Sequence, residues 1–157
     1  MAQRHWLFKS EPTSYSYEDL VSDDVAEWDG VRNFQARNML RDDIKEGDKV
    51  LFYHSSTKPM GVIGTAVVVR GGYPDHTAWD PASDHPDEKS TPDQPIWFMV
   101  DIKATGKFAG QVTLDEIKRD PRLADMVLVK AGRLSVQPVT AEQWKVIREL
   151  GKGSQST

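Results

Sequence analysis

The chain has 157 residues, with 24 acidic side chains against 20 lysines and arginines and a formal net charge of −4. At this length a single domain buries enough apolar surface to fold without a metal or a disulfide. The sequence contains no cysteine, which excludes thiolate nucleophiles, zinc fingers and iron–sulfur clusters. The acidic balance disfavours a broad basic surface that coats duplex phosphates, but it permits a pocket for one nucleotide.

The longest strongly apolar stretch, residues 61–69, is much too short to span a bilayer. The first six residues contain no apolar segment of the kind found in secretory signals. We therefore expect a cytoplasmic protein that has no membrane partner. We also expect it to be a monomer.

The first third of the chain predicts a strand followed by two short helices. Residues 5–9 form a short apolar run that is typical of a strand. A serine in a favourable capping position predicts a helix over residues 17–22. Residues 29–30, Asp-Gly, indicate a tight turn, and an asparagine then begins a predicted helix over residues 33–42.

Three further strands are predicted over residues 49–55, 61–69 and 95–103, which are rich in strand-forming residues. Two glycines inside the second of these strands indicate a bend or a bulge, which a small closed sheet requires. The long loop over residues 71–94 holds six acidic side chains and one lysine. A loop of this length in a compact domain is usually functional or mobile, and its role stays open here.

The last part of the chain predicts two capped helices and one more strand. Capping boxes begin a short helix after Thr113 and a final helix after Thr140. Between them we expect a helical turn at residues 121–126 and an alternating strand at 133–139, and beyond them a flexible tail at 151–157. Strands interrupted by short helices, without strict alternation, predict an α+β domain built on a small, bent, barrel-like sheet.

The signatures of common catalytic sites are absent from the sequence: there is no Gly-x-Ser-x-Gly elbow, no Walker A loop and no dinucleotide fingerprint. His54 and Ser55 are candidates for the base and the nucleophile of a hydrolase or nuclease, but neighbours on a strand point to opposite faces. His76 and His85 lie in the acidic loop and leave a loop metal open as a second enzymatic alternative. We expect no metal and no cofactor.

Three polar segments follow predicted strands or precede a predicted helix, namely residues 9–12, 28–33 and 53–56. Such positions gather ligand groups, because the scaffold is rigid there and backbone N–H groups point outward. Arg37, on the helix after the middle segment, and Lys9 would add a local basic rim for phosphates. The alternative for Arg37 is an ordinary solvated helix face.

The middle segment has the most specific composition. Trp28 offers a flat surface for stacking, and Arg32 and Asn33 offer planar hydrogen-bonding groups that suit a base edge or a phosphate. The alternative is structural: Trp28 belongs to the core and Arg32 pairs with Asp29. Asn33 would then only cap its helix. Composition alone leaves both interpretations open.

Four motifs resemble the EVE domain family, and they occur in the order Trp6–Pro12, Trp28–Asn38, Val50–Ser55 and Arg133–Val139. Several motifs of this length in one order are a specific signal. The resemblance extends to about Leu150 and therefore implies a single EVE domain over residues 1–150.

This resemblance implies a PUA-like fold, which is a bent β-barrel with short surrounding helices related to the PUA, ASCH and YTH domains. It also implies a pocket at the strand ends that takes a modified base from DNA or RNA, and EVE domains are linked to modified cytosines. Carried over by motif, the pocket consists of Lys9, Ser10, Trp28, Arg32, Asn33, Tyr53, His54, Ser55 and Ser135.

The expected function is that of a non-catalytic reader whose partner is DNA or RNA carrying a modified base, in the first place a modified cytosine. Trp28 would stack on the extruded base, and Arg32, Asn33 and Ser55 would read its edge. Lys9 and Arg37 would hold the flanking phosphates. Two other classes stay open, namely an enzyme that uses the His54–Ser55 pair or a loop metal, and a module that binds a small anion or a protein partner.

Overall fold

The computed structural model describes residues 4–131 and 133–152. Its helices and strands are β1 (His5–Ser10), α1 (Tyr17–Asp23), β2 (Val25–Glu27), α2 (Phe34–Asn38), the π-helical turn η1 (Met39–Asp43), β3 (Lys49–His54), β4 (Gly61–Pro74), η2 (His76–Trp79), β5 (Phe98–Thr113), α3 (Leu114–Arg119), η3 (Pro121–Leu123), α4 (Val127–Lys130), β6 (Val136–Val139) and α5 (Ala141–Lys152). No helix in this part of the chain has the length and apolar character needed to cross a membrane.

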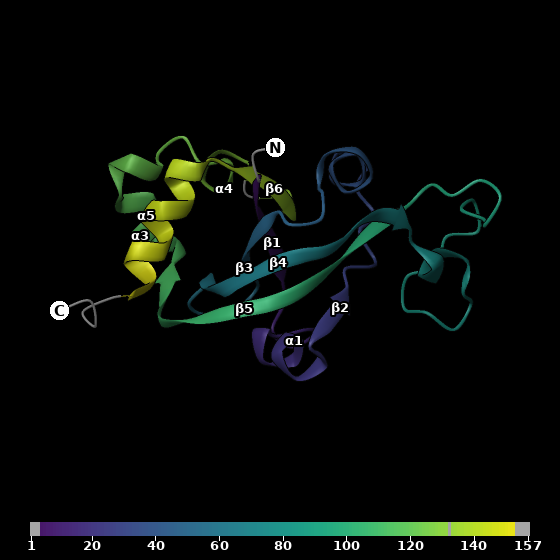
Figure 1. The fold of residues 1–157 in the computed structure, drawn as a ribbon, viewed down its shortest axis with the longest axis horizontal. Coiled ribbons are helices and arrows are strands. Elements are labelled where there is room, and N and C mark those ends of the chain that lie inside the picture. Colours follow the sequence, from purple (N-terminus) through teal and green to yellow (C-terminus); the bar gives the residue numbers. More distant parts are fainter. Residues whose placement is uncertain (1–3, 132, 153–157) are drawn as a thin grey trace.

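A single six-stranded sheet organises the domain, in the order β2-β5-β4-β3-β1-β6. β1 and β3 run parallel, and the other neighbouring strands run antiparallel. Shifts of register along the long strands β4 and β5 bend the sheet (Figure 1). The predicted α+β class, with a bent sheet and short surrounding helices, is confirmed. Because the order begins at β2 and ends at β6, the barrel is open between these two strands.

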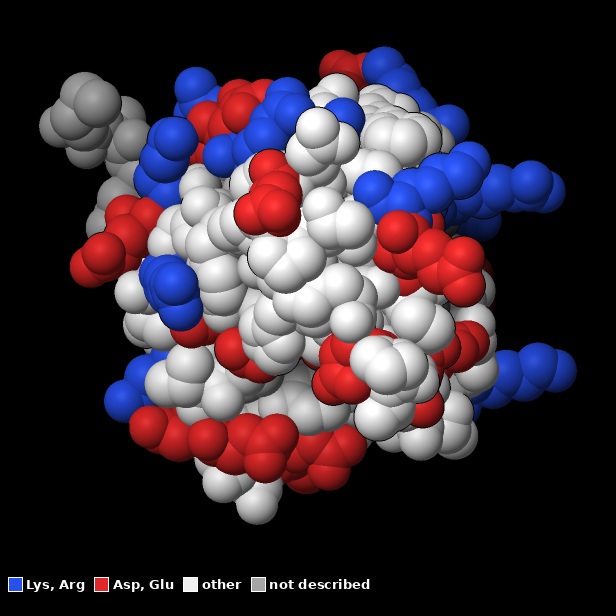
Figure 2. Space-filling view, turned by 90° about the vertical axis from the view of Figure 1, so that its right-hand side faces the viewer, with Lys and Arg blue, Asp and Glu red and all other residues white. Residues whose placement is uncertain are grey.

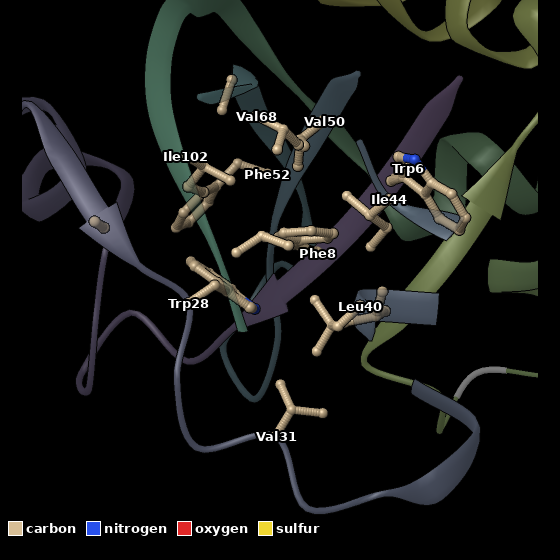
Figure 3. Packing of buried hydrophobic residues seen from close by; sticks show 14 of the residues in the cluster. Trp6, Phe8, Trp28, Val31, Leu40, Ile44, Val50, Phe52, Val68 and Ile102 are labelled. Carbon is tan, nitrogen blue, oxygen red and sulfur yellow. The ribbon is translucent and has the colours of Figure 1, made fainter. Parts of the chain in front are cut away.

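Apolar side chains pack on both faces of the sheet, and alternate residues of the central strands supply the two layers. Phe8 and Phe52 belong to a first core that also contains Trp28 (Figure 3). Leu7 and Leu51 belong to a second core, to which the helices α3, α4 and α5 contribute. Because both faces of β3 are covered, its sequence is a continuous apolar run rather than an alternating one.

Both long strands extend beyond the ranges that the sequence predicted. β4 continues to Pro74, into the stretch that we expected to be loop, and β5 continues ten residues past its predicted end to Thr113. The added residues are largely exposed, so no apolar pattern marks them. Gly72 shows why the sequence indicated a loop here. A Cβ at this position would clash with the carbonyl oxygen of Leu40 in η1. This glycine therefore reflects close packing within a strand rather than a loop.

Helix starts agree with the predicted caps. The side chains of Ser16 and Thr113 accept the expected N–H groups of α1 and α3, and both form complete capping boxes. The side chains of Thr140 and Gln143 make the corresponding reciprocal bonds at the start of α5. Short polar side chains with a partner three residues later thus locate helix starts reliably in this chain.

The observed ends of the helices agree less well with the predicted ones. The helix predicted over residues 33–42 is α2 for its first part and then the π-helical turn η1. Gly151, which we expected in a flexible tail, is a buried residue of α5 that packs against the ring of Phe108. Lys152 also belongs to α5, and the rest of the expected tail, residues 153–157, lies outside the described residues.

Tyr17 connects helix α1 to the two long strands. Its side chain is fully buried, its hydroxyl donates to the carbonyl oxygen of Thr65 at 2.8 Å, and it accepts the N–H of Gly106 at 3.1 Å. One side chain therefore satisfies two backbone groups at the bend of the sheet.

Replacing Tyr17 by phenylalanine should lower the free energy of unfolding by about 1–3 kcal/mol, because the Thr65 carbonyl and the Gly106 N–H lose their common partner. Urea denaturation measures this change. Tyr15→Phe is the matched control, since the hydroxyl of Tyr15 bonds Asp23 at an exposed position and its removal should cost less. Equal losses for the two variants would contradict the role given to Tyr17.

Candidate functional site

The parallel pairing of β1 and β3 brings polar residues together at one edge of the sheet. Ser10 stands opposite His54 in the register, and the N–H of Ser55 donates to the carbonyl of Ser10 at 3.0 Å. The N–H of Lys9 donates to the carbonyl of Ser135 at 2.9 Å, just before β6. We call Lys9, Ser10, Tyr53, His54, Ser55 and Ser135 the strand-end group. Six of the ten predicted site residues therefore lie together.

The strand-end group presents its side chains to two faces, as the alternation of a strand requires. The hydroxyl of Ser10 donates to the carbonyl of Tyr15 at 2.6 Å, and His54 accepts the N–H of Tyr17 at 3.1 Å, so both lie on the side of the first core. Lys9 and Tyr53 lie on the side of the second core. There they line a hollow of about 350 Å³, with the Lys9 ammonium 5.6 Å from the centre of the Tyr53 ring.

Trp28 lies in the first core near the end of β1. Its ring lies 5.3 Å from Phe8, 5.5 Å from Phe52 and 6.3 Å from Tyr15, measured between centroids, and only 9% of the residue is exposed. The open stacking surface that the sequence led us to expect is therefore not seen. Figure 3 shows the indole nitrogen directed toward the end of β1, and this nitrogen has no hydrogen-bond partner among the described residues. Trp28 thus directs the edge of its indole ring, and not a face of the ring, toward the end of β1.

His54 has a structural role that bears on catalysis. Because its Nε2 atom accepts the backbone N–H of Tyr17, the ring holds the first turn of α1 against β3. Burial lowers the pKa of His54, Lys107 lowers it further, and Glu18 opposes both. A general base needs the lone pair that His54 already uses in this bond. The geometry therefore disfavours the hydrolase or nuclease alternative based on the His54–Ser55 pair.

The lowered pKa of His54 should make the fold sensitive to mild acid. The unfolded chain binds a proton below about pH 6.5, the folded chain binds it only at lower pH, and stability is therefore lost as the pH falls toward the folded-state pKa. We expect the free energy of unfolding to decrease between pH 7 and 5, and to decrease less in His54→Gln, whose amide oxygen can still accept the N–H. Urea denaturation across this range measures the difference. His5, whose pKa burial also lowers, is present in both proteins, so identical profiles would contradict the assignment to His54.

Arg32 binds the acidic loop instead of facing an open pocket. Its guanidinium donates to the Asp75 carboxylate at 3.0 Å and to the carbonyl of His85 at 2.7 Å. Asp75 also accepts the N–H of Gly30, and the His85 ring packs on Gly30 so closely that a Cβ there would lie 2.8 Å from it. Gly30 has a φ of +78°, which glycine adopts readily. We call Gly30, Arg32, Asp75 and His85 the loop clamp.

Asp75 is the centre of the loop clamp, and its carboxylate is fully buried. Burial by itself raises the pKa of Asp75, but hydrogen bonds from Thr77, Gly30 and Arg32 outweigh burial and hold that pKa below its ordinary value. The carboxylate therefore stays charged and needs its cationic partner. The sequence suggested Asp29 as the partner of Arg32, and the observed partner is Asp75, 43 positions further along the chain.

The remaining predicted residues also have partners within the protein. The Asn33 side chain accepts the N–H of Ala36 and caps α2, as the structural alternative proposed. Arg37 donates to the carbonyl of Ile96 at 2.7 Å and lies over the ring of Phe34. Arg32, Asn33 and Arg37 therefore lie on the side of the loop rather than among the strand-end group.

The loop between β4 and β5 forms one end of the molecule. Figure 2 shows this end with acidic residues across its centre and lower margin and with lysines and arginines at its periphery. His76 lies against Glu27, and His85 lies 3.7 Å from Asp29. Within residues 4–131 and 133–152, no three His, Asp or Glu side chains gather as metal ligands. The described structure therefore gives the loop-metal alternative no support.

The replacement Arg32→Ala should lower the free energy of unfolding by about 3 kcal/mol, because it leaves the buried Asp75 carboxylate without its cation. The loop should also become accessible to limited proteolysis. Arg41→Ala is the matched control, since Arg41 pairs with Asp42 and both side chains are exposed, so the loss should be below about 1 kcal/mol. Protection of the loop from protease in the Arg32 variant would show that the loop clamp does not hold it.

The bent mixed sheet and its short helices define a class of small α+β domain, and known proteins share this architecture. A hypothetical protein from Leishmania major superposes with a TM-score of 0.94 over 98% of both chains, at 44% identity. The human THYN1 protein, solved in complex with 5-methylcytosine containing DNA, superposes with a TM-score of 0.90 over 97% of this chain and 99% of that one, at 36% identity. Thymocyte nuclear protein 1 of Mus musculus is 39% identical over 165 residues, which cover 93% of this chain and 73% of that protein. The EVE domain family matches residues 4–150, and the chain belongs to this family.

Proposed function

We propose that this chain binds DNA and that the strand-end group reads a modified cytosine taken out of the base stack. The observation that carries the proposal is the convergence of six polar residues at one sheet edge, together with the indole nitrogen of Trp28, which Figure 3 shows directed toward the end of β1. The human THYN1 protein, solved with 5-methylcytosine containing DNA, shares this fold at 36% identity. This likeness supports DNA as the polymer and 5-methylcytosine as the first base to test.

Recognition of the base would use hydroxyl groups and the edge of Trp28. A cytosine edge offers both acceptors and an amino donor, and a hydroxyl can supply one donor and two acceptor sites. Ser10 uses its donor on the carbonyl of Tyr15 and keeps acceptor capacity, and the backbone N–H of Ser55 donates to the carbonyl of Ser10 beside it. In this arrangement the base lies against the Trp28 edge, since aromatic neighbours surround the ring.

The protein would contact only a short stretch of DNA and would not catalyse a reaction on it. Arginines that would extend a basic surface are engaged by the acidic loop, and the end of the molecule in Figure 2 is mixed in charge. Few phosphates are then neutralised, so affinity should depend only moderately on salt. The involvement of His54 in a backbone hydrogen bond supports a reader rather than a catalyst.

The affinity for short DNA carrying 5-methylcytosine should exceed that for the same DNA with cytosine by about 10-fold or more, the size of effect that one methyl group in a fitted pocket produces. Ser10→Ala should reduce this preference, because it removes an acceptor at the base edge. Fluorescence anisotropy with labelled oligonucleotides measures both. Ser22→Ala, at an exposed position of α1, is the matched control and should bind like the unchanged protein.

Equal affinity for the methylated and the unmethylated oligonucleotide would contradict the proposal that the strand-end group recognises a modified cytosine. A log–log dependence of affinity on salt steeper than about −5 would instead indicate a broad backbone footprint, since each neutralised phosphate contributes about −0.9. An RNA strand of the same sequence belongs in the series, because its preferential binding would replace DNA by RNA as the partner.

A further inference from the structure

The hollow on the second-core side of the strand-end group has the composition of an anion site. It has a volume of about 350 Å³, and its polar lining consists of Lys9, Tyr53, Ser55, Ser56 and Lys118. These residues come from the ends of β1 and β3, the segment after β3, and the last turn of α3. None of the acidic side chains in the described part of the chain lines it, although acids outnumber bases in the sequence by 24 to 20. The local charge is therefore opposite to that of the whole protein.

Tyr53 supplies a hydrogen-bond donor to the hollow. The residue is only 2% exposed and lines the hollow, and its hydroxyl makes no hydrogen bond to any residue in the described part of the chain. The hydroxyl is not one of the fully buried side-chain atoms that lack a partner, so solvent reaches it and it is available to a ligand in the hollow. Burial raises the pKa of Tyr53 to about 12, so the hydroxyl stays protonated and acts as a donor.

Lys9 is consistent with the same chemistry. Burial lowers its pKa from the ordinary value, which means that its positive charge is held in a poorly solvated place. Lys118 is exposed at the rim and stands one helical turn after Leu114, another lining residue, so both side chains face the same space.

The opposite wall of the hollow is apolar. Met60, Leu114, Leu128 and Val129 line it. A volume near 350 Å³ is at the lower end of small-molecule pockets and suits one nucleotide. A polar rim with two lysines facing an apolar wall fits a phosphate group that carries a sugar or a base, rather than a bare inorganic ion.

We propose that this hollow binds a phosphate group, with Lys9 and Lys118 balancing its charge and the hydroxyls of Tyr53, Ser55 and Ser56 donating to its oxygens. Two sources offer this chemistry, namely the backbone phosphate of a nucleic acid strand and a free nucleoside monophosphate. The first source rests on the proposed function: Lys9, Tyr53 and Ser55 belong both to the strand-end group and to the hollow, so a strand whose base is read at the strand-end group would direct a neighbouring phosphate toward the hollow.

The first experiment measures DNA affinity as a function of salt for Lys118→Gln. The variant should bind both methylated and unmethylated DNA about 10-fold more weakly at 0.1 M salt, and its log–log salt slope should be shallower by about 1, because one fewer counterion is released. The preference for the modified base should not change. Arg119→Gln is the matched control, since Arg119 is an exposed cation of the same helical turn that does not line the hollow.

The second experiment uses deoxycytidine monophosphate and deoxycytidine as probes and follows the backbone amides of Ser55 and Ser56 by NMR. The monophosphate should shift these signals and the nucleoside should not, and Lys118→Gln and Tyr53→Phe should weaken the response. Tyr53→Phe keeps the ring in the second core, so the fold is retained and the loss reports on the hydroxyl alone.

The outcomes separate the two proposals. Binding of the monophosphate without any DNA binding would support the hollow as a site for a free nucleotide and would overturn the proposed function. A changed base preference in Ser10→Ala together with an unchanged salt slope in Lys118→Gln, and no response to the monophosphate, would overturn the phosphate site and leave base reading intact.

Discussion

The parallel pairing of β1 with β3 is the constraint on which the rest of the molecule depends. Parallel strands begin at one edge of a sheet and end at the other, so Ser10 and His54 must lie side by side. At the starting edge the buried Asp48 carboxylate accepts the Trp6 indole N–H at 2.9 Å and the backbone N–H groups of Arg4 and Lys45. This one side chain therefore holds the register of the pair from its far end, and the polar edge follows from it.

Parallel pairing also determines what lies above that edge. The chain must return across the sheet between β1 and β3, and such a crossover needs a dozen or more residues. Residues 11–48 make this connection and contain α1, β2, α2 and η1. Trp28 belongs to the crossover, which is why it closes the first core near the ends of both strands. The strand-end group and the position of Trp28 are in this sense consequences of one topology.

The loop clamp explains how an acidic protein positions its arginines. Asp75 is buried, stays charged because several hydrogen bonds lower its pKa, and holds Arg32 in place. The guanidinium also lies 5.5 Å from the ring of Trp97, so charge and aromatic packing act on it together. The segment from Gly30 to Asn33 is thereby attached to the loop at one end of the molecule, apart from the strand-end group.

The elements that the sequence predicted well are those with local causes. A cap such as Ser16 needs only a partner three residues away, and the apolar run of β3 is visible without knowing its neighbours. The outer parts of β4 and β5 have no such mark, because their pairing stabilises them while their side chains remain exposed. Sequence motifs identified the strand-end group, since all its members adjoin strands.

The differences between the expected and the observed contacts of Arg32 and Trp28 have the opposite origin. The partner of Arg32 lies 43 positions away, and nothing near Arg32 distinguishes Asp75 from Asp29 as its acid. The same holds for Trp28, whose burial depends on Phe8 and Phe52 arriving from two other elements. A residue type that can bind a base can equally well pack a core, and only the tertiary contacts decide between these roles.

The alternation of a strand gives the strand-end group its two functions under the proposals made here. Ser10 and His54 point to the first core, whereas Lys9 and Tyr53, one residue earlier on each strand, point to the second. One pair of strands therefore presents base-reading groups on one face and phosphate-binding groups on the other, at a fixed distance. A nucleotide joins a base to a phosphate through a sugar of nearly constant length, so a rigid sheet edge between the two sites suits it. Because the spacing is set by the backbone of the strands, a ligand that fits both faces needs no movement of the protein.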